Sequence, residues 1–193
     1  MNNKNDLSIN QKIIEEAINF HLAGDINKAK KHYELILEKG FTDPALLNNY
    51  AIILQQTNKV NEAISFYEKA IKLYPDNPQA YANLANIFKK LGKLTQAEFL
   101  FRKAIQIEPN FPEALCNLAN TLNSLGKTEE AIVFQKKAIT YKPNFPEALC
   151  NLGNLLKSVG RIEEALVFQR KAIEIKPDFA EAYSNIGNIL KEL

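Results

Sequence analysis

The most regularly recurring side chains of this sequence that could do chemistry are primary amides. Asparagine occupies two sets of positions spaced by 34 residues. An asparagine amide offers both a hydrogen-bond donor and an acceptor, which matches the N–H and C=O groups of a peptide backbone. The chemistry that this spacing favours is therefore noncovalent recognition. The two sets are Asn49, Asn83, Asn117, Asn151 and Asn185, and Asn86, Asn120, Asn154 and Asn188.

Groups for covalent or metal chemistry are few. Cys116 and Cys150 are also 34 residues apart, and helices stacked about 8–10 Å apart hold such residues beyond the roughly 7 Å that a disulfide spans. His21 and His32 are remote from both cysteines and form no ligand cluster. The sequence has no Gly-rich phosphate loop. We therefore expect no catalytic residue, no metal site, no cofactor and no enzyme activity.

Composition and charge exclude other classes of partner. The 193 residues carry a net charge of +2, with Lys and Glu mixed along the chain, so no basic stripe for nucleic acid is expected. No apolar run approaches the roughly 20 residues that span a bilayer, so no membrane partner is expected. The N-terminal residues MNNKNDLSINQK lack the apolar stretch of a signal peptide, which predicts a cytoplasmic protein.

The prolines show that the period extends over nearly the whole chain. One set of prolines gives position 1 of each repeat, and a second set falls at position 32. The segment NFPEALCNL also occurs twice, 34 residues apart. The two proline sets are Pro44, Pro78, Pro112 and Pro146, and Pro75, Pro109, Pro143 and Pro177.

Each repeat is predicted to be a helix, a tight turn and a second helix. Proline at position 1 suits the first turn of a helix, and proline at position 32 ends the second helix. Position 15 carries residues that tolerate a left-handed backbone: Gly24, Gly92, Gly126, Gly160 and Asn58. Small residues recur at positions 8, 20 and 27, where helices approach closely. Because each repeat buries its apolar face only against its neighbours, the fold class is an all-α solenoid.

This pattern resembles the tetratricopeptide repeat (TPR) family over about residues 10 to 193. The resemblance implies a right-handed α-solenoid of antiparallel helix pairs whose first helices line a concave, peptide-binding side. Three features depart from the family pattern. Ile36 and Phe41 replace a small residue and a proline in the first repeat. Gln135 and Gln169 stand at position 24, usually aromatic, with Phe134 and Phe168 one place earlier. The last repeat stops after one helix.

The predicted organisation is one array behind a flexible N-terminal segment, residues 1–9. The array covers residues 10–193. It comprises a divergent capping repeat at 10–43, four full repeats at 44–77, 78–111, 112–145 and 146–179, and the first helix of a truncated repeat at 180–193. Its last apolar residues, Ile186, Leu190 and Leu193, favour either a longer native chain or weak self-association through this helix.

The asparagines at positions 6 and 9 are predicted to lie on the first-helix face opposite the core. Asparagine costs roughly 0.5–0.7 kcal/mol relative to alanine inside a helix, and none occurs in second-helix interiors such as 96–108. Two explanations remain open: bonds to the adjacent helix that fix repeat geometry, or contacts with a bound peptide. The position-6 ladder is similar to that of the protein O-GlcNAc transferase arm, where it implies contact with substrate backbone.

Charged residues near this face indicate no specific ligand. Position 5 lacks the basic residues of a carboxylate clamp, since it holds Asn48, Ala82, Cys116, Cys150 and Ser184. The acids Glu113, Glu147 and Glu181 suit the first turn of a helix, and would favour ligands with Lys or Arg if they also bind. The predicted function is a protein-interaction scaffold that binds an extended peptide segment. The alternatives are the N-terminal substrate-recruiting arm of a larger glycosyltransferase-like enzyme, and structural self-association.

Overall fold

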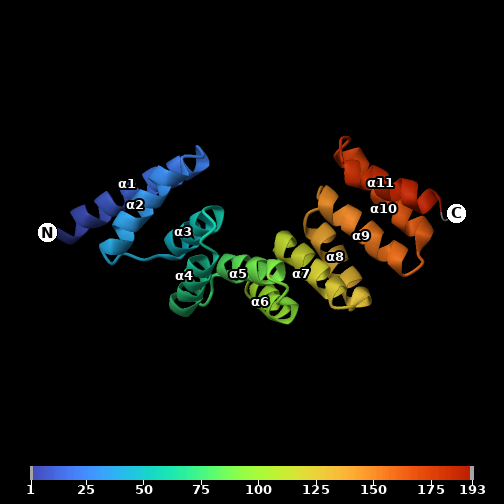
Figure 1. Ribbon diagram of the computed structural model, residues 1–193, viewed down its shortest axis with the longest axis horizontal. Coiled ribbons are helices and arrows are strands. Elements are labelled where there is room, and N and C mark those ends of the chain that lie inside the picture. Colours follow the sequence, from blue (N-terminus) through green and yellow to red (C-terminus); the bar gives the residue numbers. More distant parts are fainter. Residues whose placement is uncertain (1, 192–193) are drawn as a thin grey trace. The chain divides into compact units, whose positions relative to one another are not determined.

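A computed structural model describes the backbone of residues 2–191 and the side chains of residues 11–191. These residues form α-helices and no strand (Figure 1), which confirms the all-α prediction. The helices are α1 (Asn2–Leu22), α2 (Ile26–Glu38), α3 (Pro44–Gln56), α4 (Val60–Leu73), α5 (Pro78–Lys90), α6 (Leu94–Ile107), α7 (Pro112–Ser124), α8 (Thr128–Tyr141), α9 (Pro146–Ser158), α10 (Ile162–Ile175) and α11 (Ala180–Leu190).

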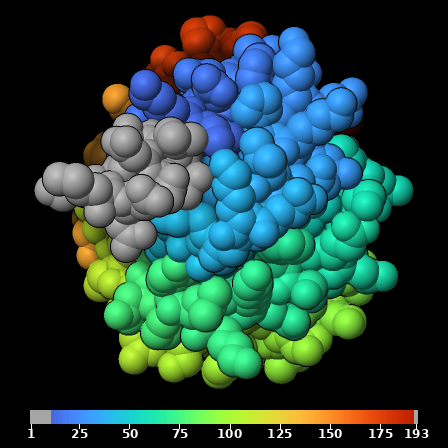
Figure 2. Space-filling model, turned by 90° about the vertical axis from the view of Figure 1, so that its left-hand side faces the viewer, coloured from blue at the N-terminus to red at the C-terminus, as the bar shows by residue number. Residues whose placement is uncertain are grey.

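The chain divides into two compact units, residues 1–84 and residues 85–193, with the division inside α5. In the first unit α1 packs on α2, α2 on α3 and α3 on α4, and the surfaces of these successive segments adjoin one another (Figure 2). In the second unit each helix from α6 to α11 packs on the next. Each helix is therefore stabilised mainly by its neighbours in sequence, as in a helical-repeat fold.

The turn inside each repeat has the left-handed backbone that the sequence predicts. Gly92 has φ 72°, and Asn58, which takes the place of glycine in the second repeat, has φ 61°. After Gly92 the N–H of Lys93 donates to the carbonyl of Phe88 at 2.9 Å. This bond satisfies a carbonyl at the helix end that would otherwise lack a donor.

Proline and aspartate define where the first helices begin. Pro44, Pro78, Pro112 and Pro146 are the first residues of α3, α5, α7 and α9, as predicted. Before α3, the side chain of Asp43 accepts a hydrogen bond from the N–H of Leu46 at 2.8 Å, which caps the helix.

The first helix, α1, begins at Asn2, within the segment 1–9 that precedes the predicted array. Residues 2–22 contain no glycine or proline, so nothing in the sequence ends the helix between this segment and the first repeat. The divergent first repeat still forms a helix pair, in which Ile36 is fully buried.

The glutamines at position 24 take the buried place of the ring. Tyr67 and Phe101 are fully buried in α4 and α6, and Gln135 and Gln169 are fully buried in α8 and α10. Phe134 lies one place earlier and packs, partly buried, against the cluster that includes Leu115 and Cys116. The amides thus replace the rings in the core, while the phenylalanines pack against the junction with the next repeat.

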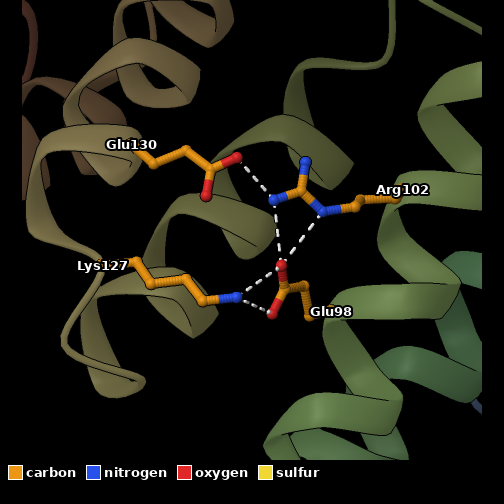
Figure 3. Close-up of polar contacts among 4 residues, drawn as sticks. All are labelled: Glu98, Arg102, Lys127 and Glu130. Carbon is orange, nitrogen blue, oxygen red and sulfur yellow. Dashed lines mark hydrogen bonds and ion pairs between the residues drawn. The ribbon is translucent and has the colours of Figure 1, made fainter.

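An ion-pair network joins the second helices of two repeats (Figure 3). Glu98 of α6 accepts hydrogen bonds from Lys127 at 2.8 Å and from Arg102 at 2.9 Å, and Arg102 also pairs with Glu130 of α8. The side chain of Glu98 is only 11% exposed. Burial raises its pKa, but the bonds from Lys127 and Arg102 outweigh burial and hold the pKa below its usual value. The network therefore fixes α6 relative to α8.

Candidate functional site

The position-6 asparagines, called the asparagine row below, lie on successive first helices. Asn49 and Asn83 belong to α3 and α5 in the first unit, and Asn117, Asn151 and Asn185 belong to α7, α9 and α11 in the second. All five are partly buried, which is less exposure than a helical wheel indicates for the face opposite the core. A helical wheel takes only one helix into account, whereas α7 contacts α9 and α9 contacts α11.

The first helix of the preceding repeat binds the amide of most row residues. The amide Nδ2 of Asn83 donates to Oδ1 of Asn48 at 3.0 Å. The corresponding Nδ2 atoms of Asn151 and Asn185 donate to the thiol sulfurs of Cys116 and Cys150 at 3.5 and 3.2 Å. Each amide thus has a fixed orientation and retains a second N–H and an oxygen for further hydrogen bonds.

Asn117 is held by a different contact. Its Oδ1 accepts a hydrogen bond from Nζ of Lys89 at 2.9 Å. Lys89 is partly buried, and burial lowers the pKa of its ammonium group. At this member of the row the amide accepts an internal hydrogen bond, whereas Asn83, Asn151 and Asn185 donate one, so the row does not leave the same atoms available at every repeat.

The position-9 asparagines are less uniform. Asn86, Asn120 and Asn154 are partly buried, whereas Asn188 is exposed. Oδ1 of Asn154 accepts a hydrogen bond from Nε2 of Gln169 at 2.9 Å. This set therefore contributes to packing in at least one repeat and is a weaker candidate for ligand contact than position 6.

Behind the row, a polar network extends into the core of the second unit. Nε2 of Gln135 donates to Sγ of Cys116 at 3.3 Å and to the carbonyl of Ala148 at 2.9 Å. The same Cys116 sulfur accepts the bond from Asn151. Gln135 therefore connects α8 to the row through a cysteine, and the arrangement fixes the positions of α7, α8 and α9.

The two cysteines support neighbouring side chains. Both are free thiols and buried. Burial raises the pKa of Cys116, and it raises the pKa of Cys150 to about 11. At neutral pH both thiols are therefore protonated, and a thiolate nucleophile is not available at either position.

Two of the three acids at position 2, Glu113 and Glu147, are engaged within their own repeats. Glu113 pairs with Lys142 at 2.7 Å, and Glu147 lies 4.0 Å from Lys176. The hydrogen bond from Lys142 holds the pKa of Glu113 below its usual value. These ion pairs favour the structural explanation for the acids over ligand selection.

A small depression reaches the row in the first unit. It has a volume of about 260 Å³ and lies at the N-terminal ends of α3 and α5. Its lining residues are Pro44, Ala45, Asn48, Asn49, Asn77 and Gln79. The polar groups that face it are amides, so it presents hydrogen-bonding groups without net charge.

The last described helix leaves an apolar face uncovered. Tyr183 and Leu190 of α11 are 53% and 54% exposed, and Ile186 is partly buried. Leu193, the third residue of the predicted self-association face, lies outside the described residues. No helix within residues 2–191 is both long and apolar enough to cross a membrane.

Profiles of known protein families match most of the repeats. The profile of the TPR repeat matches residues 53–92, 119–160 and 153–193, which is more than half of the chain. Profiles described as tetratricopeptide repeat match residues 78–111 and 100–133. The chain belongs to the tetratricopeptide repeat family. Its matched segments overlap every repeat from the second onward, in agreement with the period read from the prolines.

Solved structures share the TPR fold at low sequence identity. TTC0263, a thermophilic TPR protein of Thermus thermophilus, is 21% identical with a TM-score of 0.72, covering 94% of this chain and 99% of that chain. A TPR protein of Parabacteroides merdae is 20% identical with a TM-score of 0.78, covering 94% and 72%. YrrB, described as having an unusual peptide-binding site, is 24% identical with a TM-score of 0.71, covering 83% and 82%. No curated protein sequence matches this chain.

The sequence missed the residues that orient the asparagine row. Asn48, Cys116 and Cys150 stand at position 5, and each meets the row residue 35 positions later. An acceptor side chain at position 5 could have predicted these contacts from the sequence. Ala82, at the same position, has no acceptor in its side chain. Lys89, which holds Asn117, carries no comparable signal in the sequence.

Proposed function

We propose that this TPR chain is a non-catalytic interaction module that binds an extended peptide segment along the part of its asparagine row that lies within one unit. Repeats of this family generally mediate protein–protein interactions. The observation that carries the proposal is the fixed orientation of the row: Asn83, Asn151 and Asn185 each donate to the preceding first helix. Each of these amides keeps hydrogen-bonding capacity for a ligand.

The chemistry of the row suits a peptide backbone. A free amide N–H and oxygen pair with backbone C=O and N–H groups whatever side chains the peptide carries. An extended peptide advances about 3.3–3.6 Å per residue, so about three residues correspond to one helix-to-helix step of 8–10 Å. We therefore expect broad sequence tolerance and one backbone contact for roughly every three peptide residues.

Charge supports an uncharged or mixed ligand. Two of the position-2 acids, Glu113 and Glu147, are paired with Lys142 and Lys176, and Lys89 is engaged with Asn117. The row thus lacks a free charge cluster that would select a strongly acidic or basic peptide. Ligand affinity would come from repeated backbone hydrogen bonds and burial of side chains between successive first helices.

A peptide-library selection on the purified chain tests the proposal. The matched pair of variants is Asn117→Ala/Asn151→Ala/Asn185→Ala, which removes the row of the second unit, and Asn110→Ala/Asn144→Ala, which changes exposed loop asparagines. The expected result is that selected peptides bind the parent and the loop variant but lose at least tenfold in affinity for the row variant. Equal affinity for all three proteins, with unchanged helix content, would contradict the proposal.

A further inference from the structure

A second surface of the chain carries three parallel rows of side chains, all of them exposed except the partly buried Lys103. At position 22, the second helices α6, α8 and α10 expose Phe99, Val133 and Val167 to 59%, 52% and 50%. The same position holds Ser65 in the second repeat and Lys31 in the first. The apolar row is therefore confined to three consecutive second helices of the second unit, and repeat architecture alone does not require it.

Opposite charges flank the apolar row. Four residues before it, at position 18, stand the exposed acids Glu129 and Glu163. Four residues after it, at position 26, stand Lys103, Lys137 and Lys171. Residues spaced by four lie on one face of a helix. The acid and the lysine of one helix are eight residues apart, about 12 Å along the axis at 1.5 Å per residue, which is too far for them to pair with each other.

The ion-pair network keeps two of these helices in register. Arg102 of α6 pairs with Glu130 of α8, and Lys127 pairs with Glu98 (Figure 3). The helices α8 and α10 are both packed on α9. Because positions 18, 22 and 26 repeat on each helix, the acidic, apolar and basic rows run parallel across the face.

We propose that this face binds a second copy of the chain, with a two-fold axis running along the apolar row. Rotation about that axis lays the acidic row of one copy on the lysine row of the other and places apolar side chains against each other. Because the two copies are identical, the distance between the acidic and basic rows is the same in both, as an isologous interface requires. An axis across the row would instead oppose like charges, and the acids disfavour an anionic lipid surface.

Sedimentation velocity of the purified chain tests this surface directly. The apolar contact is small, so we expect a weak dimer that forms between about 10 μM and about 1 mM and dissociates as salt is raised. Val133→Glu should leave a monomer throughout this range. Its matched control, Ser65→Glu, changes position 22 of the second repeat and should dimerise like the parent.

Variants with reversed charges distinguish this interface from other possible interfaces. Glu129→Lys/Glu163→Lys and Lys137→Glu/Lys171→Glu should each be monomeric alone, and an equal mixture should form a heterodimer, because the basic face of one variant attracts the face of the other, whose α8 and α10 carry acids in both flanking rows. The control Lys69→Glu/Lys72→Glu reverses two charges on α4 and should not change the parent dimer. Helix content by circular dichroism should be the same for all variants.

Three results would overturn the proposal. The first is a parent chain that stays monomeric over the whole range. The second is a dimer that survives Val133→Glu and is lost on Leu190→Glu, which would place the contact on α11. The third is a monomer that sediments with vesicles of anionic phospholipid, which would assign the rows to a membrane surface.

Discussion

Position 24 separates two kinds of repeat in this chain. In α6 the ring of Phe101 fills the buried site, whereas in α8 and α10 the amides of Gln135 and Gln169 fill it. Each amide donates through Nε2, to the carbonyls of Ala148 and Cys150 respectively. The Oε1 atoms of both glutamines have no hydrogen-bond partner among the described residues. A buried acceptor without a partner costs about 1–3 kcal/mol, so the glutamines stabilise the core less than a ring does.

The repeats that contain Gln135 and Gln169 gain hydrogen bonds between the core and the first helices. Gln135 bonds Cys116, which accepts from Asn151, and Gln169 bonds Asn154 directly. In these repeats the core is therefore connected to the asparagines of the first helices. In the repeat of Gln135, we interpret the exchange as stability given up for a fixed orientation of the Asn151 amide in the asparagine row.

The largest effect should follow from copying the glutamine into the aromatic repeat. Phe101→Gln removes a fully buried ring and places an amide where Ala82 takes the place of the thiol that Gln135 binds in its own repeat. We expect a loss of about 3–5 kcal/mol in the free energy of unfolding, measured by urea denaturation. A loss below about 1 kcal/mol would mean that the two kinds of site are interchangeable.

The next effect tests how tightly Gln169 is held. A Cβ on Gly153 would lie 2.6 Å from Nε2 of Gln169, so Gly153→Ala must displace the buried amide. We expect a loss of about 1–3 kcal/mol in the free energy of unfolding. Gly187→Ala is the matched control, because its Cβ would meet nothing within 4 Å, and alanine should stabilise that helix by up to about 1 kcal/mol.

The two repeats also differ at position 21, which is the charged Glu98 in α6 and the apolar Ile132 in α8. Since the folded-state pKa of Glu98 is lowered, its stabilisation is present above the unfolded-state pKa and is lost as pH falls through the folded value. Glu98→Gln should cost roughly 1–2 kcal/mol at pH 7. The difference from the parent should shrink between about pH 5 and pH 2, and a difference that stays constant there would contradict the ionic role.

The smallest change in stability is expected at Gln135 itself. Gln135→Leu removes the hydrogen bond to the carbonyl of Ala148, which destabilises the fold. It also removes the buried oxygen that lacks a partner, which stabilises the fold. We expect the free energy of unfolding to change by less than about 1 kcal/mol, while the amide proton signals of Asn151 broaden in NMR spectra. A sharp, unshifted Asn151 side-chain signal would remove the proposed connection between core and row.

The period of 34 residues was enough to predict the helices, the left-handed turns at Gly92 and Asn58, and the prolines at helix starts. These features depend on a residue and its near neighbours in sequence. Burial of the row was not predictable in the same way, because contacts such as Asn151 with Cys116 depend on how two first helices pack. The network around Glu98 likewise depends on the offset between α6 and α8, which a repeat alignment does not contain.

The most direct test of the account is calorimetric binding of a selected peptide and of versions carrying one backbone N-methyl group each. If the asparagine row binds the peptide backbone, methylation at roughly every third residue should weaken binding at least tenfold, and alanine substitution of most peptide side chains should weaken it much less. The row variant Asn117→Ala/Asn151→Ala/Asn185→Ala should lose this periodic sensitivity. Affinity that depends on side chains and not on backbone N–H groups would contradict the claim that the row recognises a peptide backbone.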